Sequence, residues 1–431
     1  MPSLLSDELL RDVMAAGQTD VLVGLPTQNH ADTAGAVASA VMSAFSGPFV
    51  RERTVLLNLD GGSTDGTPEV VRSAAMQSGD IVSARYALRT IHRITAPYHG
   101  LPGRGSALRI MFTVAELLRA RAVFIPDPTA AAIDIDDVAA WIRAVLAGGA
   151  DYVKPAIPRS SGDGPLVTQI VRPLFRAACG ARLLEPLDTQ LACSGGFAAS
   201  ALAKDFWGLP DAEVGLDAFL TTYALTGAFR LLQVGTAASA HVDAERRPRT
   251  SELFQQVIGA VFHALARSFD FWSETRGSSA VTISGRVPTA PTRSPTFDLG
   301  SFTEAFGSGV DALAPLLASV LGSPLLERLR AAGRTTPIAL DDQLWASIVF
   351  AFLRAAVQAT ATPQELAQML EPLYLGRVVS FLNDIAAGDA IEKLERLALV
   401  FEEQKPSLVG AVRNQENEDE GKRVGAAGGS A

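Results

Sequence analysis

The sequence contains little cysteine and no excess of positive charge. Its 431 residues include two cysteines, Cys179 and Cys193, whose spacing fits neither a zinc site nor a disulfide framework. Both are expected to be buried thiols of a protein in the reducing cytoplasm. The net charge of −9 provides no basic field that could displace counterions, so nucleic acid is not expected as a main partner.

Long uncharged apolar runs are also missing. The apolar run Ile348–Leu353 is followed directly by Arg354, and no stretch reaches the length of a transmembrane helix. The segment Met1–Gln18 mixes charged and apolar residues, which predicts an amphipathic helix rather than a secretory signal. With 48% hydrophobic and 19% charged residues, the chain is expected to form one large core or two domains, with no membrane span.

Short apolar runs alternate with amphipathic stretches in the first half of the chain. Strands are predicted at Asp20–Pro26, Val55–Leu59, Asp80–Tyr86, Ala122–Ile125 and Tyr152–Ile157. Helices are predicted between them, at Thr33–Phe45, Pro68–Met76, Ala107–Arg119 and Ile135–Ala147. This alternation predicts an α/β fold with a mostly parallel, doubly wound sheet flanked by helices.

The second half changes to helical character. A helix is predicted at Pro165–Ala178, a loop-rich stretch at Glu185–Ser200 and a strand at Phe229–Val234. The composition predicts an α/β domain over residues 1–275, a linker or loop over 276–300 and an α-helical C-terminal subdomain over 301–405. Residues 414–431 are polar and rich in Gly and Ala, which predicts a disordered tail.

The most informative segment follows the predicted strand Val55–Leu59. It reads Asp60-Gly-Gly-Ser-Thr-Asp-Gly-Thr67, and Thr67 with Pro68 predicts the cap and first position of the next helix. The glycine pair allows a sharp turn and a close approach of the backbone to a ligand. Open α/β sheets bind ligands at the carboxyl ends of their strands, so this run predicts a ligand loop, although an ordinary turn carries the same residue types.

Two other loops offer groups that suit a nucleotide. The first, Pro26–Thr33, follows the first predicted strand and offers Asn, His and Asp to a base or ribose, or simply caps a helix. The second contains Gly103-Arg104-Gly105 directly before a helix. Backbone amides at a helix start with a cation beside them suit a diphosphate, while a glycine-rich connector would have the same sequence.

Two further positions carry metal-ligating side chains. Asp127 follows the short strand Ala122–Ile125, where a carboxylate can hold a divalent cation against diphosphate oxygens. His241 follows the strand Phe229–Val234. A single His is more often structural than a ligand, and it becomes a candidate metal ligand if it meets Asp127 in space.

Together these loops resemble the GT-A glycosyltransferases, and more closely the glucosylglycerate, mannosylglycerate and glucosyl-3-phosphoglycerate synthase group. The resemblance runs from Asp20 to about Leu265 and, more weakly, through Leu340–Asn383. The segments that carry it are Val23–Thr33, Asp60–Thr67, Gly100–Leu108, Gly215-Leu-Asp217 and the stretch around His241. It implies the Rossmann-like GT-A fold and a homodimer, in addition to the cytoplasmic location and the absence of a nucleic-acid partner expected from the cysteines and the net charge.

The resemblance also implies a reaction. A hexose would pass from a nucleoside-diphosphate sugar (GDP- or UDP-glucose or mannose) to a small polar acceptor such as glycerate or 3-phosphoglycerate, with retention and with help from Mg²⁺ or Mn²⁺. The donor would be bound by Pro26, Thr27, Asn29, Asp60, Gly103, Arg104, Gly105 and Asp127. The implied metal ligands are Asp127 and His241, the acceptor residues Thr189, Gln190 and Ser194, and the catalytic residues Asp217 and Gln190.

Three positions depart from the family pattern. Thr129 stands where the family has the second Asp of Asp-x-Asp, Gln190 where it has an acidic acceptor residue, and Arg104 where it has Lys. A Gln side chain cannot act as a base, so a non-catalytic nucleotide-sugar-binding protein on the same fold is the alternative. A dinucleotide-binding Rossmann protein is a third hypothesis. It is disfavoured because this sequence has no Gly-x-Gly-x-x-Gly run after the first predicted strand.

Overall fold

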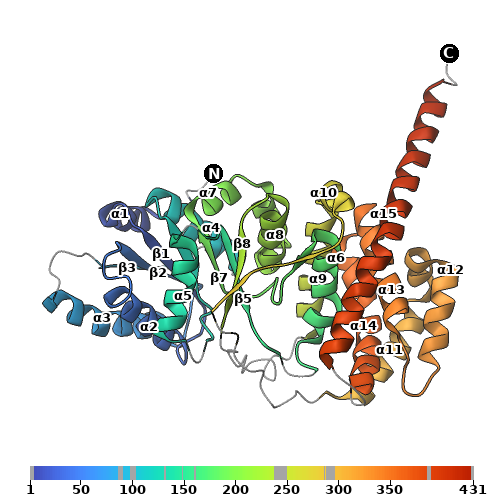
Figure 1. Ribbon diagram of the computed structural model, residues 1–431, viewed down its shortest axis with the longest axis horizontal. Helices are drawn as coiled ribbons and strands as arrows, with labels where there is room; N and C mark the ends of the chain where they lie inside the picture. The colour runs from blue at the N-terminus through green and yellow to red at the C-terminus, as the bar shows by residue number, and fades with distance from the viewer. Residues whose placement is uncertain are drawn as a thin grey trace. The chain divides into compact units, whose positions relative to one another are not determined.

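The structure is a computed structural model (Figure 1). It describes residues 4–85, 91–97, 103–130, 133–147, 149–159, 162–236, 250–285, 287, 297–385 and 390–428. The chain divides into two compact units, and each is described by itself. The first unit comprises Met1–Pro158, Leu183–Pro248 and Ala280–Pro291, and the second comprises Arg159–Arg182, Arg249–Ser279 and Thr292–Ala431.

Among the described residues, the first unit is built on a sheet of eight strands in the order β10-β8-β5-β7-β4-β1-β2-β3. Neighbouring strands run parallel except at β7, which is antiparallel to β4 and to β5. The strands are β1 (Val21–Thr27), β2 (Thr54–Asp60), β3 (Ile91–Pro97), β4 (Ala122–Ile125), β5 (Tyr152–Ala156), β7 (Leu191–Ser194), β8 (Leu231–Gly235) and β10 (Ile283–Ser284). The predicted α/β class with a mostly parallel sheet is confirmed.

Helices cover both faces of this sheet (Figure 1). One face carries α2 (Ala34–Ser46) and α5 (Ile135–Leu146), with α3 (Thr67–Arg85) beside α2. The other carries α4 (Arg104–Leu117), α7 (Gly195–Leu202) and α8 (Ala212–Thr226). The unit also contains α1 (Asp7–Ala16) and the short helix η2 (Asp205–Gly208).

Alternation along β1 shows how its residues divide between the two faces. Val21, Val23 and Leu25 are fully buried in the core with α2 and α5. Gly24 points to the other face, where a Cβ atom would lie 2.5 Å from Met111 Sδ of α4. Successive side chains of a strand point to opposite faces, so the glycine allows α4 to pack directly on β1.

The described part of the second unit is mainly helical. Its helices are η1 (Val167–Val171), α6 (Arg172–Cys179), α9 (Thr250–Ala266), α10 (Phe269–Glu274), α11 (Leu299–Ala312), α12 (Ala314–Gly333), α13 (Asp342–Val357), α14 (Pro363–Ile385) and α15 (Ala390–Gly428). Two short strands, β6 (Ala181–Arg182) and β9 (Ser279–Ala280), pair with each other. The expected C-terminal helical region is therefore present, and it includes earlier segments of the chain.

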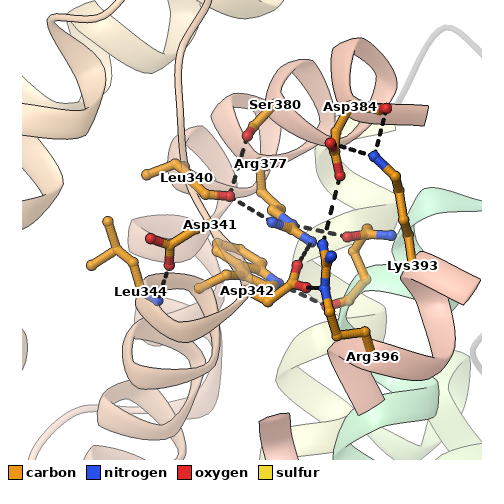
Figure 2. A network of polar contacts seen from close by, with 11 residues as sticks. Leu340, Asp341, Asp342, Leu344, Arg377, Ser380, Asp384, Lys393 and Arg396 are labelled. Carbon is orange, nitrogen blue, oxygen red and sulfur yellow. Dashed lines mark hydrogen bonds and ion pairs between the residues drawn. The ribbon is translucent and has the colours of Figure 1, made fainter. Parts of the chain in front are cut away.

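A buried arginine joins the helices of the second unit (Figure 2). Arg377 of α14 is 4% exposed and donates to Gln169 Oε1 at 2.9 Å, Leu340 O at 2.5 Å and Asp342 Oδ1 at 2.6 Å. Asp342 also accepts from Arg396 Nε at 2.9 Å. Three acceptors on two segments, η1 and the chain entering α13, satisfy this buried charge, which fixes the positions of both segments relative to α14.

Two predicted elements of the first 200 residues are wrong. The strand expected at Asp80–Tyr86 is not formed, because α3 continues to Arg85 and the strand follows at Ile91–Pro97. The β-branched residues there favour a strand only weakly, and context decides between the two structures. The loop-rich stretch Glu185–Ser200 contains β7 and α7, whose short, small-residue sequences give no clear periodicity.

The C-terminal stretch also differs from expectation. Helix α15 continues to Gly428, so the backbone is helical over residues 414–428, where composition predicted disorder. Extending an existing helix needs no new nucleus, which favours its continuation into a polar sequence. Within the described ranges, no single helix is both long and apolar enough to cross a membrane; the bent pair α11 and α12 reaches that length and composition jointly.

Candidate functional site

Polar side chains gather at the carboxyl edge of the parallel strands in the first unit. Thr27 ends β1 and lies opposite Asp60, which ends β2. Asp127 follows β4, the other neighbour of β1. Three loops predicted from the sequence to bind the donor therefore leave adjacent strands at one edge of the sheet.

The carboxylate of Asp60 holds its own turn together. Its side chain accepts from Gly62 N at 3.0 Å, from Ser63 N at 2.7 Å and from Thr27 Oγ1 at 3.1 Å. Asp60 is 6% exposed, and Gly62 has a φ of +88°, which favours glycine. The structure thus places Asp60, predicted to bind the nucleoside, beneath the loop as its organising group.

Hydrogen bonds join the loop after β1 to the loop after β2. Asn29 N donates to Ser63 Oγ at 2.8 Å, and Asn29 Oδ1 accepts from Thr64 N at 2.9 Å. Asp65 Oδ2 accepts from Ala31 N at 3.0 Å. Asn29 has a φ of +56°, a left-handed conformation that asparagine tolerates well. These contacts give the predicted nucleoside side of the site a fixed, preformed wall, beside which Pro26 is half-buried.

A buried amide lies under this wall. Asn58 of β2 is 1% exposed, and its Oδ1 lies 3.1 Å from Thr27 Oγ1. Its Nδ2 has no partner among the described residues. The single Thr27 hydroxyl proton can serve one acceptor, and Asp60 needs it, so the Asn58 amide is left incompletely paired. Sequence reasoning passed over Asn58, although an Asn inside the apolar run Val55–Leu59 was a visible signal.

The start of α4 packs tightly against α8. A Cβ atom on Gly105 would lie 2.4 Å from Ala212 O, and one on Gly103 would lie 2.9 Å from Glu213 O. Glu213 also accepts from Ser106 Oγ at 2.9 Å and from Ser106 N at 3.3 Å. The predicted diphosphate cradle therefore already receives a carboxylate, and the glycines serve close packing of two helices.

Arg104 and Lys154 hold Asp217 between them. Arg104 Nε donates to Asp217 Oδ2 at 2.7 Å, and Lys154 Nζ donates to Asp217 Oδ1 at 3.2 Å. Arg104 Nη2 also donates to Thr189 O. The side chains are 14% exposed for Arg104, 1% for Lys154 and 6% for Asp217. The predicted donor-binding Arg104 and catalytic Asp217 are thus in direct contact.

The pKa values follow from this arrangement. Burial opposes the charge of Asp217, but Arg104 and Lys154 outweigh it and keep the pKa of this carboxyl below its ordinary value. Burial lowers the pKa of the Lys154 ammonium, while Asp217 acts in the opposite direction. Asp217 is therefore ionised near neutral pH, and its two hydrogen bonds hold the Arg104 guanidinium in place.

The predicted acceptor loop meets the same cluster. Lys154 Nζ donates to Asp188 O at 2.5 Å, and Asp188 Oδ1 accepts from Gln190 N at 2.8 Å. Burial raises the pKa of Asp188 to about 6, against the attraction of Lys154, and the charge of buried Glu185 adds to the rise. Gln190 is 5% exposed, and its Nε2 has no partner among the described residues.

Asp127 lies close enough to this cluster for its charge to act on Arg104 and on Asp188. It is 6% exposed, and its Oδ1 accepts from Thr129 N and Thr129 Oγ1, both at 2.8 Å. The other predicted metal ligand, His241, lies outside the described residues. Within the described ranges, no group of three or more His, Cys, Asp or Glu side chains forms a metal site. These residues supply one candidate ligand, Asp127, and do not complete a Mg²⁺ or Mn²⁺ site.

Ser194 lies away from the cluster. It is paired with Ala122, the first residue of β4, whereas Leu191 is paired with Ile125 at the end that leads to Asp127. Ser194 Oγ caps α7 by accepting from Phe197 N at 3.1 Å. Because β7 is antiparallel to β4, Ser194 stands at the amino edge of the parallel strands, and its predicted acceptor role finds no support in its placement.

The structure therefore gathers most of the predicted residues in one region. Arg104, Thr189 and Asp217 are in contact, and Gln190 is bonded to Asp188 beside them. Sequence reasoning missed Lys154, Glu185 and the charge of Asp188. A lysine inside the apolar strand Tyr152–Ile157 was the available signal for Lys154, because a buried ammonium requires a partner.

Comparisons with known proteins give matches among solved structures alone. No model of a known protein family and no curated protein matches the chain. The structure is similar to glucosyl-3-phosphoglycerate synthase from Mycobacterium tuberculosis in complex with uridine diphosphate, with 22% identity and a TM-score of 0.40 over 62% of this chain and 86% of that one. The complex of that synthase with Mn²⁺, UDP-glucose and phosphoglyceric acid has 22% identity and a TM-score of 0.41, over 62% of this chain and 85% of that one. Mannosyl-3-phosphoglycerate synthase from Rubrobacter xylanophilus has 20% identity and a TM-score of 0.38, over 61% of this chain and 78% of that one. These synthases bear the names of the group that the sequence motifs resemble.

Proposed function

We propose that this protein is a glycosyltransferase of the GT-A type that transfers a hexose from a nucleoside-diphosphate sugar to the hydroxyl group of a small polar acceptor. The bond between the anomeric carbon and the diphosphate breaks, and a bond from that carbon to the acceptor oxygen forms. The nucleoside diphosphate leaves, and the hydroxyl proton is released. UDP- or GDP-glucose or mannose as donor, and glycerate or 3-phosphoglycerate as acceptor, are the proposed substrates.

The observation that carries this proposal is the convergence of Arg104, Asp127 and Asp217 at the carboxyl edge of the sheet. Asp217 binds Nε and Nη2 of Arg104, and within the described chain Nη1 has no protein acceptor. The guanidinium therefore keeps two N–H groups for a phosphate. The preformed wall of the β1 and β2 loops belongs to the same carboxyl edge as Asp127, and it suits a nucleoside.

The roles of the residues follow from their placement. Arg104 would bind and neutralise the diphosphate, while Asp217 and Lys154 would fix its orientation. Gln190 would donate its unpaired Nε2–H to a sugar or acceptor hydroxyl, as a buried amide requires. A bound Mg²⁺ or Mn²⁺ would add charge neutralisation at the leaving diphosphate. Because the described ligand set is incomplete, none of the roles above depends on that ion.

A substrate panel tests the proposal. The protein is incubated with UDP- and GDP-sugars and with glycerate or 3-phosphoglycerate, in EDTA and with Mg²⁺ or Mn²⁺, and product and released nucleotide are measured. Phosphoglycerate and UDP-glucose are included because the M. tuberculosis synthase structure contains them. We expect turnover, and we expect Arg104→Met to reduce it about 100-fold or more through the lost charged contacts. The absence of product and nucleotide release over the whole panel would overturn the proposal.

A non-catalytic nucleotide-sugar-binding protein is the second candidate. Gln190 and Thr129 favour it, because neither side chain is acidic and Thr129 occupies an oxygen of Asp127. Calorimetry separates the two functions: nucleotide binding that is indifferent to Mg²⁺, with no turnover, supports the second candidate. The glycosyltransferase proposal also includes a homodimer and a cytoplasmic location. Light scattering, which measures the molar mass in solution, tests the homodimer.

A further inference from the structure

The second unit contains a cavity of about 750 Å³, within the range of small-molecule sites. Helices α12, α13, α14 and α15, labelled in Figure 1, contribute to its wall. Its lining includes the buried residues Val320, Ala355 and Met369 and the exposed Leu316. Polar side chains, among them Ser319 and three glutamines, complete the lining. About half of the lining residues are apolar and the others are polar or charged, so the cavity offers a small molecule both packing and hydrogen-bonding surface.

Arg354 brings a positive charge to this wall. Its one described hydrogen bond, from Nη2 to Val320 O, measures 3.4 Å, close to the limit for such a bond. Over the described ranges, Arg354 forms no ion pair with a carboxylate. It also lines a neighbouring cavity of about 220 Å³. Its guanidinium donors are therefore available to an anion in the larger cavity.

Glu365, which also lines the cavity, has another task. Its carboxylate accepts from Thr362 N and Thr362 Oγ1, both at 2.8 Å, at the start of α14. This is a capping arrangement, stabilised by the helix dipole. The described lining thus contains one cation, Arg354, and one carboxylate, Glu365, which is bonded to Thr362 and not to Arg354. A single arginine suits a monoanionic carboxylate, whereas a phosphate dianion normally requires further donors or cations.

We propose that this cavity binds a small molecule that has one carboxylate and an apolar body. The carboxylate accepts two parallel hydrogen bonds from Arg354, and the body packs against Leu316, Val320 and Met369. Gln358 and Gln415, joined at 2.7 Å, lie in the same wall and link α13 to α15. The site lies wholly in the second unit, and it is independent of the proposed transferase activity.

Octanoate is the probe for this site, and octan-1-ol of equal chain length is its uncharged control. Binding to the full chain is measured by ligand-observed NMR and by calorimetry. We expect saturable octanoate binding that Arg354→Met weakens about tenfold or more, because it removes a charge-assisted pair. Arg328→Met, which removes an exposed arginine of α12 outside the cavity lining, should leave the affinity unchanged.

A second variant keeps the test valid if Arg354→Met perturbs folding. Ser319 is exposed on α12 and lines the cavity, so Ser319→Trp should occupy part of it and weaken octanoate binding without changing the melting temperature. Octanoate binding that is equal in all variants, or that octan-1-ol reproduces in strength, would overturn the proposal. So would a dimer that Ser319→Trp dissociates and that binds no octanoate, because a second copy would then occupy this surface.

Discussion

At the scale of single residues, the acceptor loop contains an acid with an unusual pKa. Asp188 has a pKa of about 6, raised mainly by burial from 3.8. The folded state therefore disfavours its charge. The stability associated with Asp188 is complete below about pH 4 and is lost as the pH rises through about 6.

Asp188→Asn removes this titration and keeps an oxygen that can accept from Gln190 N. We expect the variant to equal the wild type near pH 4 and to exceed it by about 2 kcal/mol near pH 7.5, with the two-unit shift discounted for partial exposure. Urea unfolding in EDTA at both pH values measures the difference. A difference that does not change with pH would show that Asp188 is ionised at its ordinary pKa in the folded protein.

Lys154 is the second residue that the structure singles out. It is 1% exposed and donates both to Asp217 and to the carbonyl of Asp188. Lys154→Met removes the charge while keeping much of the volume, and it leaves a buried carboxylate and a carbonyl less well paired. We expect a loss of about 3 kcal/mol in the free energy of unfolding.

Arg109→Met is the matched control for Lys154→Met. Arg109 is exposed on α4 in the same unit, and its loss should change the stability by less than about 0.5 kcal/mol. Urea unfolding of both variants gives the comparison. If the two variants lose the same stability, the contacts of Lys154 with Asp217 and Asp188 contribute nothing measurable.

At the scale of elements, the contact between α4 and α8 depends on glycine. The Cβ of Gly105→Ala would lie 2.4 Å from Ala212 O and 3.0 Å from Glu213 Cα, both backbone atoms that can move only with their helix. We expect a loss of about 2 kcal/mol from this overpacking, measured by thermal unfolding. Gly208→Ala is the control, because no described atom lies within 4 Å of its added Cβ. Equal melting temperatures for the two variants would contradict the close packing.

Elements with a strong local pattern were predicted well. The strands β1, β2, β4 and β5 lie within two residues of their predicted bounds, because continuous apolar runs mark buried strands. The strand β7 was missed, since its four residues, Leu-Ala-Cys-Ser, give neither periodicity nor a β-branched run. Its antiparallel insertion between β4 and β5 is a long-range pairing that no local pattern encodes.

The candidate site shows the same division. Asp127 and Asp217 were predicted, because their loop and helix motifs are legible in the sequence. The loop motifs did not show that the Asp60 carboxylate would accept hydrogen bonds from its own turn, or that Glu213 would accept hydrogen bonds at the start of α4. These contacts depend on which segments meet in space, and Lys154 was missed for the same reason.

At the scale of the whole molecule, the chain passes between its two units more than once. The sequence predicted contiguous domains, whereas the helical unit includes Arg159–Arg182 and Arg249–Ser279. Composition could not show this, because helices in either unit have similar amphipathic patterns. The buried network around Arg377 contains Gln169 from one of these segments, so a residue of the first half of the chain helps to hold the C-terminal helices.

Arg377→Met tests the network of Figure 2 at this scale. It leaves Gln169, Asp342 and Leu340 without their shared donor, so we expect a loss of about 3–5 kcal/mol in the helical unit. Hydrogen exchange should show faster exchange in α13 and α14 and unchanged exchange in β1 and β2.

Arg396→Met is the matched control, because Arg396 binds the same Asp342 but its side chain is 60% exposed. Its removal should cost less than about 1 kcal/mol. Equal exchange rates in α13 and α14 for the two variants would mean that the buried pair is no more important than the exposed one.

The antiparallel strand β7 has a consequence for synthesis on the ribosome. The strands β4 and β5 do not pair with each other, so the centre of the sheet closes when Leu191–Ser194 enters between them. Until then, a nascent chain holds two unpaired strand edges, which are the kind of surface that promotes aggregation. Translation must therefore proceed past residue 194 before the centre of the sheet can close, and past residue 284 before all of its described strands have been made.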